Sequence, residues 1–210
     1  MSLKAIFLNA SLKRRQELSN TQVLCEFLGK QLKRYGVQSE YIRLSQYNIR
    51  PGVYTNVPKD DWVRIYRKIL TADILIFATP IWWDVHSSLL QRIIERLDEV
   101  HDDFMNTGKS VLANKVAGVV ITGDSDGAMH IIGSVAMLCM WLGLTMAPLG
   151  SLSVLGPELA KGSKITKAKL WKLYEREYTP LARATAQNLS HMAKLLKQHP
   201  YPTFLLPWKD

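Results

Sequence analysis

Two nearly continuous apolar runs restrict the possible fold of this chain more than any other feature. They read ADILIFAT over residues 72–79 and KVAGVVIT over residues 115–122. Short runs of this kind are typical of strands that are buried on both faces, as in parallel sheets. Such a sheet needs helices on both of its faces, so the chain is predicted to be an α/β protein.

Helical and strand patterns alternate along the rest of the chain. This alternation predicts a doubly wound parallel sheet within one domain that spans residues 1–210. Its core is expected at about residues 1–157 and a helical C-terminal extension at about residues 158–210, with an interruption of the helical pattern at Pro180. Further strands are predicted at residues 4–9, 38–43 and 144–155, and helices at residues 19–35, 60–70, 87–100, 128–142 and 166–198.

The composition is that of an ordinary globular protein, with 47% hydrophobic and 21% charged residues, which argues against disorder. No apolar stretch approaches the length of a membrane span, and the run at residues 5–8 is too short for a signal-peptide core. We therefore expect a cytoplasmic protein. Cys25 and Cys139 each lie in an apolar helical pattern and are predicted to be buried and reduced, and no cysteine or histidine spacing indicates a metal site.

The net charge of +9 is concentrated toward the C-terminus. Residues 158–210 contain ten Lys and Arg and four Asp and Glu, which accounts for six of the nine charges. These charges are scattered along a predicted helix and no nucleic-acid motif accompanies them, so no nucleic-acid partner is expected. They form either a solvated helix face or a surface that attracts anionic ligands such as phosphates.

The loop over residues 9–21, NASLKRRQELSNT, joins the first predicted strand to the first helix. Ligands of open parallel sheets bind at the carboxyl ends of the strands, and a helix N-terminus there favours anions. This loop therefore predicts a site for a phosphate monoester. The alternative is that Ser19 only caps the helix and the basic residues are exposed loop charges. The candidate residues are Ser11, Lys13, Ser19, Asn20 and Thr21.

The loop after the next buried strand, residues 78–86, reads ATPIWWDVH. Pro80 restricts the backbone as it leaves the strand, and Ile81, Trp82 and Trp83 place flat apolar side chains at the same edge of the sheet. These side chains are expected to border a flat ring of the ligand. The alternative is that both tryptophans pack under helices or in a dimer contact.

A third loop, residues 122–130, reads TGDSDGAMH. Thr122 supplies a hydroxyl group, and Gly123 and Gly127 allow the backbone to approach a ligand closely. The acidic residues resemble a calcium loop only faintly, because Val135 stands where such a loop needs glutamate. Calcium is therefore rejected, and His130 alone is more typical of a structural histidine. A phosphate site, an aromatic loop and a glycine loop at successive strand ends fit one ligand, FMN.

Several blocks of this chain resemble the flavodoxin-like NADPH-dependent FMN reductase family of NAD(P)H oxidoreductases. They include LNASLKRRQELSNT, ATPIWW, SSLLQRIIERLD, KVAGVVITGDSDGAMHIIG, LGLTMAP and TAQNLSHMAKLLKQHPYP. The resemblance implies a five-stranded parallel sheet in the order 2-1-3-4-5 with non-covalently bound FMN. It also implies that the phosphate is held by Ser11, Lys13, Ser19, Asn20 and Thr21. Pro80, Ile81, Trp82 and Trp83 would line the ribityl chain and ring, and Thr122, Gly123 and Gly127 the polar edge of the ring.

The predicted function is that of an oxidoreductase that moves a hydride from NAD(P)H to FMN and on to a small acceptor such as a quinone or free flavin. No side chain need act as a catalytic group, because the flavin carries the chemistry. The alternatives are a flavodoxin-type electron carrier and a non-catalytic FMN-binding protein. A pI of about 9.6 favours an anionic pyridine nucleotide over the basic partners of a carrier. The predicted helix at residues 87–100 and the apolar residues 136–142 and 204–208 offer more apolar surface than one sheet buries, which predicts a homodimer. No membrane partner is expected.

Overall fold

The computed structural model describes residues 2–202. Its strands are β1 (Leu3–Asn9), β2 (Val37–Arg43), β3 (Ile74–Trp82), β4 (Val85–His86), β5 (Val116–Gly123) and β6 (Thr145–Leu155). Its α-helices are α1 (Asn20–Lys33), α2 (Trp62–Leu70), α3 (Ser88–Arg96), α4 (Asp98–Thr107), α5 (Ala128–Leu142), α6 (Lys167–Leu173) and α7 (Thr179–Gln198). Short helical turns are η1 (Leu44–Gln46), η2 (Pro157–Leu159) and the π-helical η3 (Tyr174–Tyr178).

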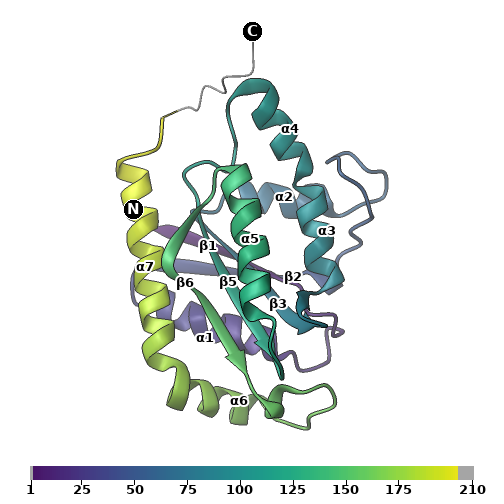
Figure 1. The fold of residues 1–210 in the computed structure, drawn as a ribbon, viewed down its shortest axis with the longest axis vertical. Coiled ribbons are helices and arrows are strands. Elements are labelled where there is room, and N and C mark those ends of the chain that lie inside the picture. The colour runs from purple at the N-terminus through teal and green to yellow at the C-terminus, as the bar shows by residue number, and fades with distance from the viewer. Residues whose placement is uncertain (1, 203–210) are drawn as a thin grey trace.

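Five strands form a parallel sheet in the order β2-β1-β3-β5-β6, which confirms the predicted order. The central strands are buried on both sides. Phe7, Ile76 and Val120 pack with α1, α6 and α7 on one face, and the alternate strand residues pack with α2, α3, α4 and α5 on the other. Figure 1 shows α5 in front of the sheet and α7 along the edge formed by β6. The continuous apolar runs are therefore the two-sided cores of β3 and β5.

The C-terminal helices belong to the same hydrophobic core as the sheet. Leu170, Tyr174 and Leu189 are fully buried, and the ring of Tyr174 lies 5.9 Å from that of Phe27 in α1. The expected break at Pro180 is wrong in detail. Pro180 lies in the first turn of α7, where a missing N–H costs no helical hydrogen bond, and the irregularity is the π-helical segment just before it.

Residues 87–100 form two helices where one was predicted. The two helices meet at the buried Leu97, whose dihedral angles of φ −86° and ψ −3° depart from regular helical values. The preceding Arg96 is also buried, and it pairs with the buried carboxylate of Asp60. Arg96 donates further hydrogen bonds to the carbonyls of Arg50 and Thr55. This cluster holds the long connection between β2 and α2 against α3.

The tryptophan segment is a β-hairpin and not the loop that the sequence suggested. β3 continues to Trp82 and pairs in antiparallel fashion with β4, with Trp82 opposite Val85. Trp83 and Asp84 form the two-residue turn, and both have positive φ, 49° and 63°. A tight two-residue hairpin needs this left-handed geometry because its twist matches that of the strands. The hairpin carries the tryptophans beyond the carboxyl edge of the sheet.

Candidate functional site

A cavity of about 620 Å³ lies at the carboxyl edge of the sheet, between the connections that follow β1, β3, β5 and β6. Volumes of about 300–1,000 Å³ are usual for sites of small molecules and cofactors. Ten of the twelve residues predicted to bind the cofactor border this cavity. They are Ser11, Lys13, Asn20, Thr21, Pro80, Ile81, Trp82, Trp83, Thr122 and Gly123.

One end of the cavity is formed by the connection from β1 to α1. The backbone N–H of Ser11 donates to Asn9 Oδ1 at 3.0 Å, and that of Lys13 lies 3.4 Å from Ser11 Oγ, so the chain turns around Ser11. Asn20 and Thr21 occupy the first turn of α1, whose leading N–H groups have no partner within the helix. Hydroxyl groups, a helix N-terminus and the Lys13 ammonium group are suited to a phosphate.

A pair of buried hydroxyl groups joins this end to the neighbouring strand. Thr21 Oγ1 and Thr122 Oγ1 lie 2.7 Å apart, and both residues are almost completely buried. Each hydroxyl can both donate and accept, so the pair can also bind a ligand oxygen without losing its own hydrogen bond.

Ser19 does not border the cavity. Its side chain accepts a hydrogen bond from the backbone N–H of Gln22 at 3.1 Å and caps α1. Ser19 therefore acts as a helix cap, which was the alternative to a phosphate ligand. A cap of this type orients the first turn of the helix and therefore the groups that face the cavity.

The hairpin forms the apolar wall of the cavity. Trp82 Nε1 is buried and donates no hydrogen bond to any residue between 2 and 202. Buried N–H groups are nearly always paired in folded proteins, and Trp82 lines the cavity, so its N–H group is a candidate donor to a bound ligand. Trp83, in contrast, is 96% exposed at the rim.

Several contacts hold the hairpin in place. Ser87 donates from its backbone N–H to Thr79 Oγ1 at 3.0 Å, and its own Oγ donates to the carbonyl of Ala10 at 2.6 Å. Gly127 starts α5 against the turn, and a methyl group there would come within 2.6 Å of Asp84 Cα. Gly127 therefore lies behind the hairpin and does not border the cavity, in contrast to the predicted role at the edge of the ring.

Sequence reasoning missed the contribution of the connection after β6. Leu159, Ala160 and Lys161 border the cavity, and the carbonyl of Leu159 accepts a hydrogen bond from Asn20 Nδ2 at 3.3 Å. Lys161 Nζ lies 5.9 Å from the centroid of the Trp82 ring. No local motif marks these residues, and only the position of β6 at the edge of the sheet could have suggested them. They add a second cation to the one supplied by Lys13.

Burial changes the pKa of a histidine in the hairpin and of a cysteine in α5. Burial lowers the pKa of His86 in β4, and the neighbouring His130 lowers it further. His86 Nε2 lies 2.9 Å from Gln91 Oε1 on α3, so the ring is held behind the hairpin. Burial raises the pKa of Cys139 to about 12, and both cysteines are buried free thiols, as predicted.

Two further expectations concern metals and membranes. Within residues 2–202, no group of His, Cys, Asp and Glu side chains is arranged to hold a metal ion. No helix in this part of the chain is both long and apolar enough to cross a bilayer.

A parallel sheet in this order, with a ligand-sized cavity at its carboxyl edge, defines a flavodoxin-like α/β protein. Residues 3–157 match the family NADPH-dependent FMN reductase, and the chain belongs to this family. It is an oxidoreductase with FMN as cofactor and NAD(P)H as co-substrate. The unpaired Trp82 N–H, the hydroxyl groups of Thr21 and Thr122 and the helix N-terminus are compatible with this cofactor.

Relatives of known identity include flavin-modifying proteins. The chain is 30% identical over 215 residues to 8-demethyl-8-aminoriboflavin-5'-phosphate synthase of Streptomyces davaonensis. The alignment covers 98% of this chain and 82% of the synthase. The crystal structure of RosB with bound 8-demethyl-8-formylriboflavin-5'-phosphate superposes with a TM-score of 0.81 at 29% identity, covering 95% of this chain and 82% of RosB.

A third relative is a much longer protein. Over 151 residues the chain is 34% identical to the divalent metal cation transporter MntH of Mycobacterium bovis, a match that covers 70% of this chain. The chain spans only 22% of the length of that transporter.

Proposed function

We propose that this protein transfers electrons from NAD(P)H through FMN to a small acceptor such as a quinone or a free flavin. The observation that carries the proposal is the cavity that combines the N-terminus of α1 with the unpaired N–H of Trp82. When bound there, FMN accepts a hydride from NAD(P)H and passes electrons to the acceptor.

The phosphate group of FMN would lie at the start of α1. Ser11, Asn20 and Thr21 supply hydrogen-bonding groups there, and Lys13 and Lys161 supply positive charge. Each hydrogen bond to a charged group contributes about 1.5–3 kcal/mol, so these residues would provide a large part of the binding energy.

The ring would lie against the hairpin and the end of β5. Ile81 and Trp82 supply an apolar wall, and Gly123 allows Ile81 to pack against the end of β5, since a methyl group at Gly123 would come within 2.9 Å of the Ile81 side chain. The Trp82 N–H would donate to an acceptor atom of the flavin. No residue need accept a proton in this arrangement, because the flavin carries the chemistry.

Trp83 would serve the second substrate. Its indole is exposed at the rim, so it offers a flat apolar surface beside the opening. Stacking of aromatic rings contributes about 0.5–1.5 kcal/mol beyond burial of area. A planar acceptor or the nicotinamide would use this surface.

The relationship to the synthase supports a second candidate function, in which the flavin phosphate is itself the substrate. The name of that relative describes riboflavin-5'-phosphate whose 8-methyl group is replaced by an amino group. The two chains align over nearly all of this chain. This candidate differs from the first in its product, because the flavin would leave the protein chemically changed.

One experiment separates these functions. The purified protein is loaded with FMN and its visible spectrum is recorded before and after anaerobic addition of NADPH, then after addition of a quinone. Bleaching by NADPH and recovery with quinone, with FMN of unchanged mass, is the expected result. A flavin of altered mass would support the second candidate, and a spectrum that NADPH does not change would contradict the first.

The outer ridge of α5 would form the interface of a homodimer. Met129, Gly133, Ala136 and Met140 recur at helical spacing, and the two methionines are 76% and 79% exposed. Light scattering at micromolar concentration is expected to give twice the chain mass for the wild type and the single mass for Met140→Glu. A single mass for the wild type would contradict the dimer.

The chain would act as one FMN-binding domain of residues 1–210, with a core of about residues 1–157 and the helical extension of about residues 158–210 packed on it. Buried reduced thiols support a cytoplasmic location. The partners would be small molecules, and neither a nucleic acid nor a membrane is required.

A further inference from the structure

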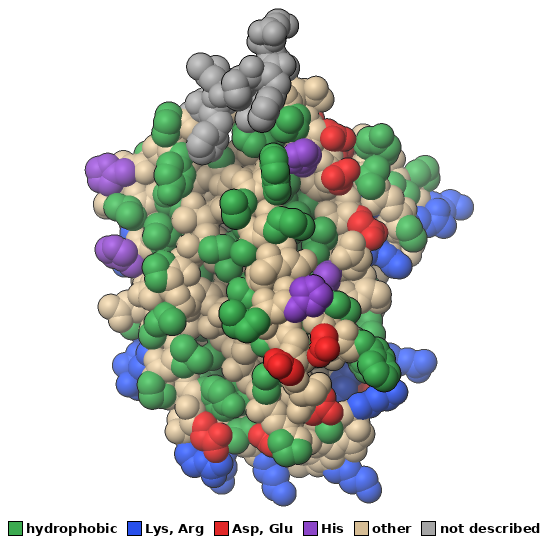
Figure 2. All heavy atoms as spheres, viewed as in Figure 1, with side chains coloured by type: hydrophobic (Ala, Val, Ile, Leu, Met, Phe, Trp, Pro, Cys, Tyr) green, Lys and Arg blue, Asp and Glu red, His purple; other side chains and the backbone are tan. Residues whose placement is uncertain are grey.

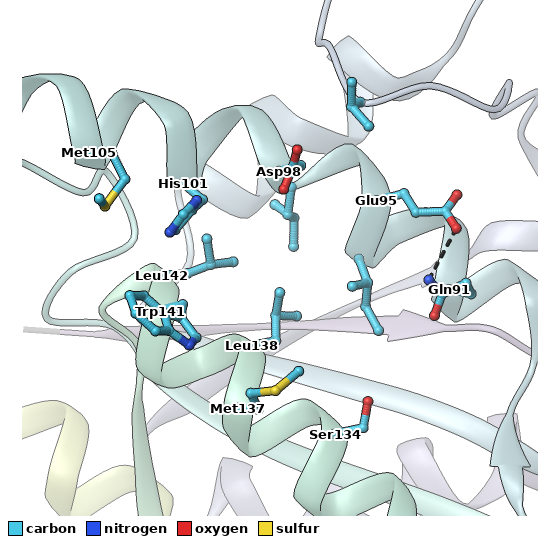
Figure 3. A pocket seen from close by; sticks show the side chains of 13 residues that line it. Gln91, Glu95, Asp98, His101, Met105, Ser134, Met137, Leu138, Trp141 and Leu142 are labelled. Carbon is cyan, nitrogen blue, oxygen red and sulfur yellow. Dashed lines mark hydrogen bonds between the residues drawn. The ribbon is translucent and has the colours of Figure 1, made fainter.

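Within residues 2–202, two further hollows share no lining residue with the cavity at the carboxyl edge of the sheet. The larger one, which we call the α5 groove, has a volume of about 690 Å³ and lies between α5 and the helices α3 and α4. Figure 3 shows side chains from both helix layers directed into it. Its surface is mostly apolar, and its carboxylates, Glu95 and Asp98, disfavour an anionic ligand.

The second hollow lies against α6 and has a volume of about 610 Å³. We call it the α6 hollow. All of its lining residues fall within residues 158–177, whereas the family match ends at residue 157. The α6 hollow is therefore a feature of the helical extension and lies outside the matched part of the chain.

Three cations occupy one face of α6 and η3. Lys169, Lys172 and Arg176 recur at helical spacing, and all three line the hollow. Arg176 pairs with Glu177, but Lys169 and Lys172 are exposed and have no carboxylate partner between residues 2 and 202. Figure 2 shows Lys and Arg side chains along the lower end of the molecule, where α6 lies in Figure 1. Two ammonium groups are thus available to an anionic ligand.

The rest of the hollow is partly apolar. Ile165 and Leu173 line it and are both half-buried. The remaining carboxylate, that of Glu158, is turned toward the backbone of η2, since a methyl group on Gly156 would come within 2.7 Å of it. Apolar side chains beside a few placed charges are usual in small-molecule sites. This combination suits a ligand that carries both a flat ring and a phosphate.

The opposite side of α6 is fixed to α1, so the hollow exists before a ligand binds. Leu170 and Tyr174 are fully buried, and the ring of Trp171 lies 5.5 Å from that of Phe27 in α1. Tyr174 Oη also donates a hydrogen bond to the carbonyl of Asn20 at 3.4 Å. A preformed site loses less binding energy to ordering of side chains.

The α6 hollow and the proposed FMN site are separated by one short turn of the chain. Glu158 in η2 lines the hollow, and the next residue, Leu159, lines the cavity. Consecutive Cα atoms are only about 3.8 Å apart. Lys161 in the same connection lies 5.9 Å from the centroid of the Trp82 ring in the cavity. An elongated molecule that reacts at FMN can therefore extend across this turn into the hollow.

We propose that the α6 hollow binds the adenosine part of NADPH, with its 2'-phosphate between Lys169 and Lys172. The inference rests on the proposed function, in which the nicotinamide reacts with FMN in the neighbouring cavity. The adenine would pack on Ile165 and Leu173. NADPH and NADH differ only in the 2'-phosphate, and a cation beside this group is a known means of accommodating NADPH. The two lysines would thus select NADPH over NADH.

A variant that carries both Lys169→Gln and Lys172→Gln tests this site. The KM for NADPH is expected to rise at least about fivefold, equivalent to about 1 kcal/mol, while the KM for NADH stays unchanged. Calorimetry with adenosine 2',5'-bisphosphate on the FMN-loaded protein should show a similar loss of affinity. The control carries Lys33→Gln and Lys194→Gln, which remove the same two charges from exposed positions outside the hollow.

Three kinetic results would overturn the inference: an unchanged KM for NADPH in the double variant, an equal rise in the control, or an equal rise for NADH. If neither nucleotide reduces the flavin, the proposed function fails and calorimetry decides the inference alone. Bisphosphate binding that the Lys169 and Lys172 variant loses and the control keeps would support it. Absence of bisphosphate binding by the wild type would overturn it. Exposed lysines tolerate glutamine, so both variants are expected to remain folded.

Discussion

We call the proposed FMN site at the carboxyl edge of the sheet the flavin cavity. Its volume, about 620 Å³, is close to the 690 Å³ of the α5 groove, the hollow between α5, α3 and α4, but the two differ in chemistry. The cavity lies at strand ends, where a helix N-terminus and an unpaired indole N–H meet. The groove lies between helix surfaces and has charged groups only at its rim. Size therefore does not identify the functional site. The chemistry of the lining does, because a helix N-terminus and hydroxyl groups at strand ends suit a charged polar ligand, whereas apolar helix surfaces do not.

The largest effect, on the stability of the fold, is expected from breaking the buried ion pair between Arg96 and Asp60. Asp60→Ala leaves the guanidinium group of Arg96 buried without its partner, which should lower the free energy of unfolding by about 3–5 kcal/mol. Urea denaturation measures the loss. The affinity of the folded fraction for FMN should stay unchanged, because neither residue borders the flavin cavity. A loss of FMN binding in the folded protein would show that the two regions are coupled.

The phosphate end of the flavin cavity should give the next largest effect. Thr21→Ala removes a hydroxyl group that would bind the phosphate, and one hydrogen bond to a charged group is worth about 1.5–3 kcal/mol. Titration should show FMN affinity falling at least about tenfold, while riboflavin affinity hardly changes. Ser134→Ala in the α5 groove is the control and should leave both affinities unchanged. Equal losses for FMN and riboflavin would place the phosphate elsewhere.

The two tryptophans of the hairpin should respond differently. Trp82→Phe removes the unpaired N–H, so FMN affinity should fall about fivefold for a loss of about 1 kcal/mol while the FMN-free protein does not lose stability. Trp83→Ala should leave FMN affinity unchanged and raise the KM for NADPH or the acceptor. Steady-state kinetics with FMN-saturated protein measure the second effect. If both variants behave like the wild type, the tryptophans have only a structural role.

The role of Ser19 can be separated from that of Thr21. Because Ser19 Oγ caps α1, Ser19→Ala should lower the free energy of unfolding by about 1 kcal/mol. Its effect on FMN affinity should be smaller than that of Thr21→Ala, because Ser19 does not border the cavity. Thermal denaturation and FMN titration of both variants make the comparison. A larger loss of FMN binding for Ser19→Ala than for Thr21→Ala would show that Ser19 contributes to the phosphate site.

The smallest effect concerns acid stability. Since burial lowers the pKa of His86 in the folded protein, the unfolded chain binds a proton there more readily. The stability that comes from neutral His86 is therefore fully present above about pH 6.5, the usual pKa of histidine, and is lost as the pH falls through this value. His86→Gln should lose less stability than the wild type between neutral and mildly acidic pH. Unfolding curves at both pH values measure the difference.

The sequence by itself determined the class of fold and most of the flavin cavity. The apolar runs of β3 and β5 indicate burial on both faces, and the parallel arrangement brings the ends of β1, β3 and β5 to one edge. Residues in the connections directly after these strands therefore come together whatever the details of packing. For this reason ten of the twelve predicted residues border one cavity.

Only the tertiary structure decided which groups in these connections face the cavity. Ser19 and Thr21 are both polar, yet Ser19 caps the helix and Thr21 meets Thr122, because residues two positions apart at a helix start point to different sides. Lys161 reaches Trp82 across long sequence separation, and Gly127 supports the hairpin from behind. The α5 groove likewise depends on the turn at Leu97, which separates α3 from α4. Local pattern cannot specify these contacts, because each depends on the packing of segments that are distant in the chain.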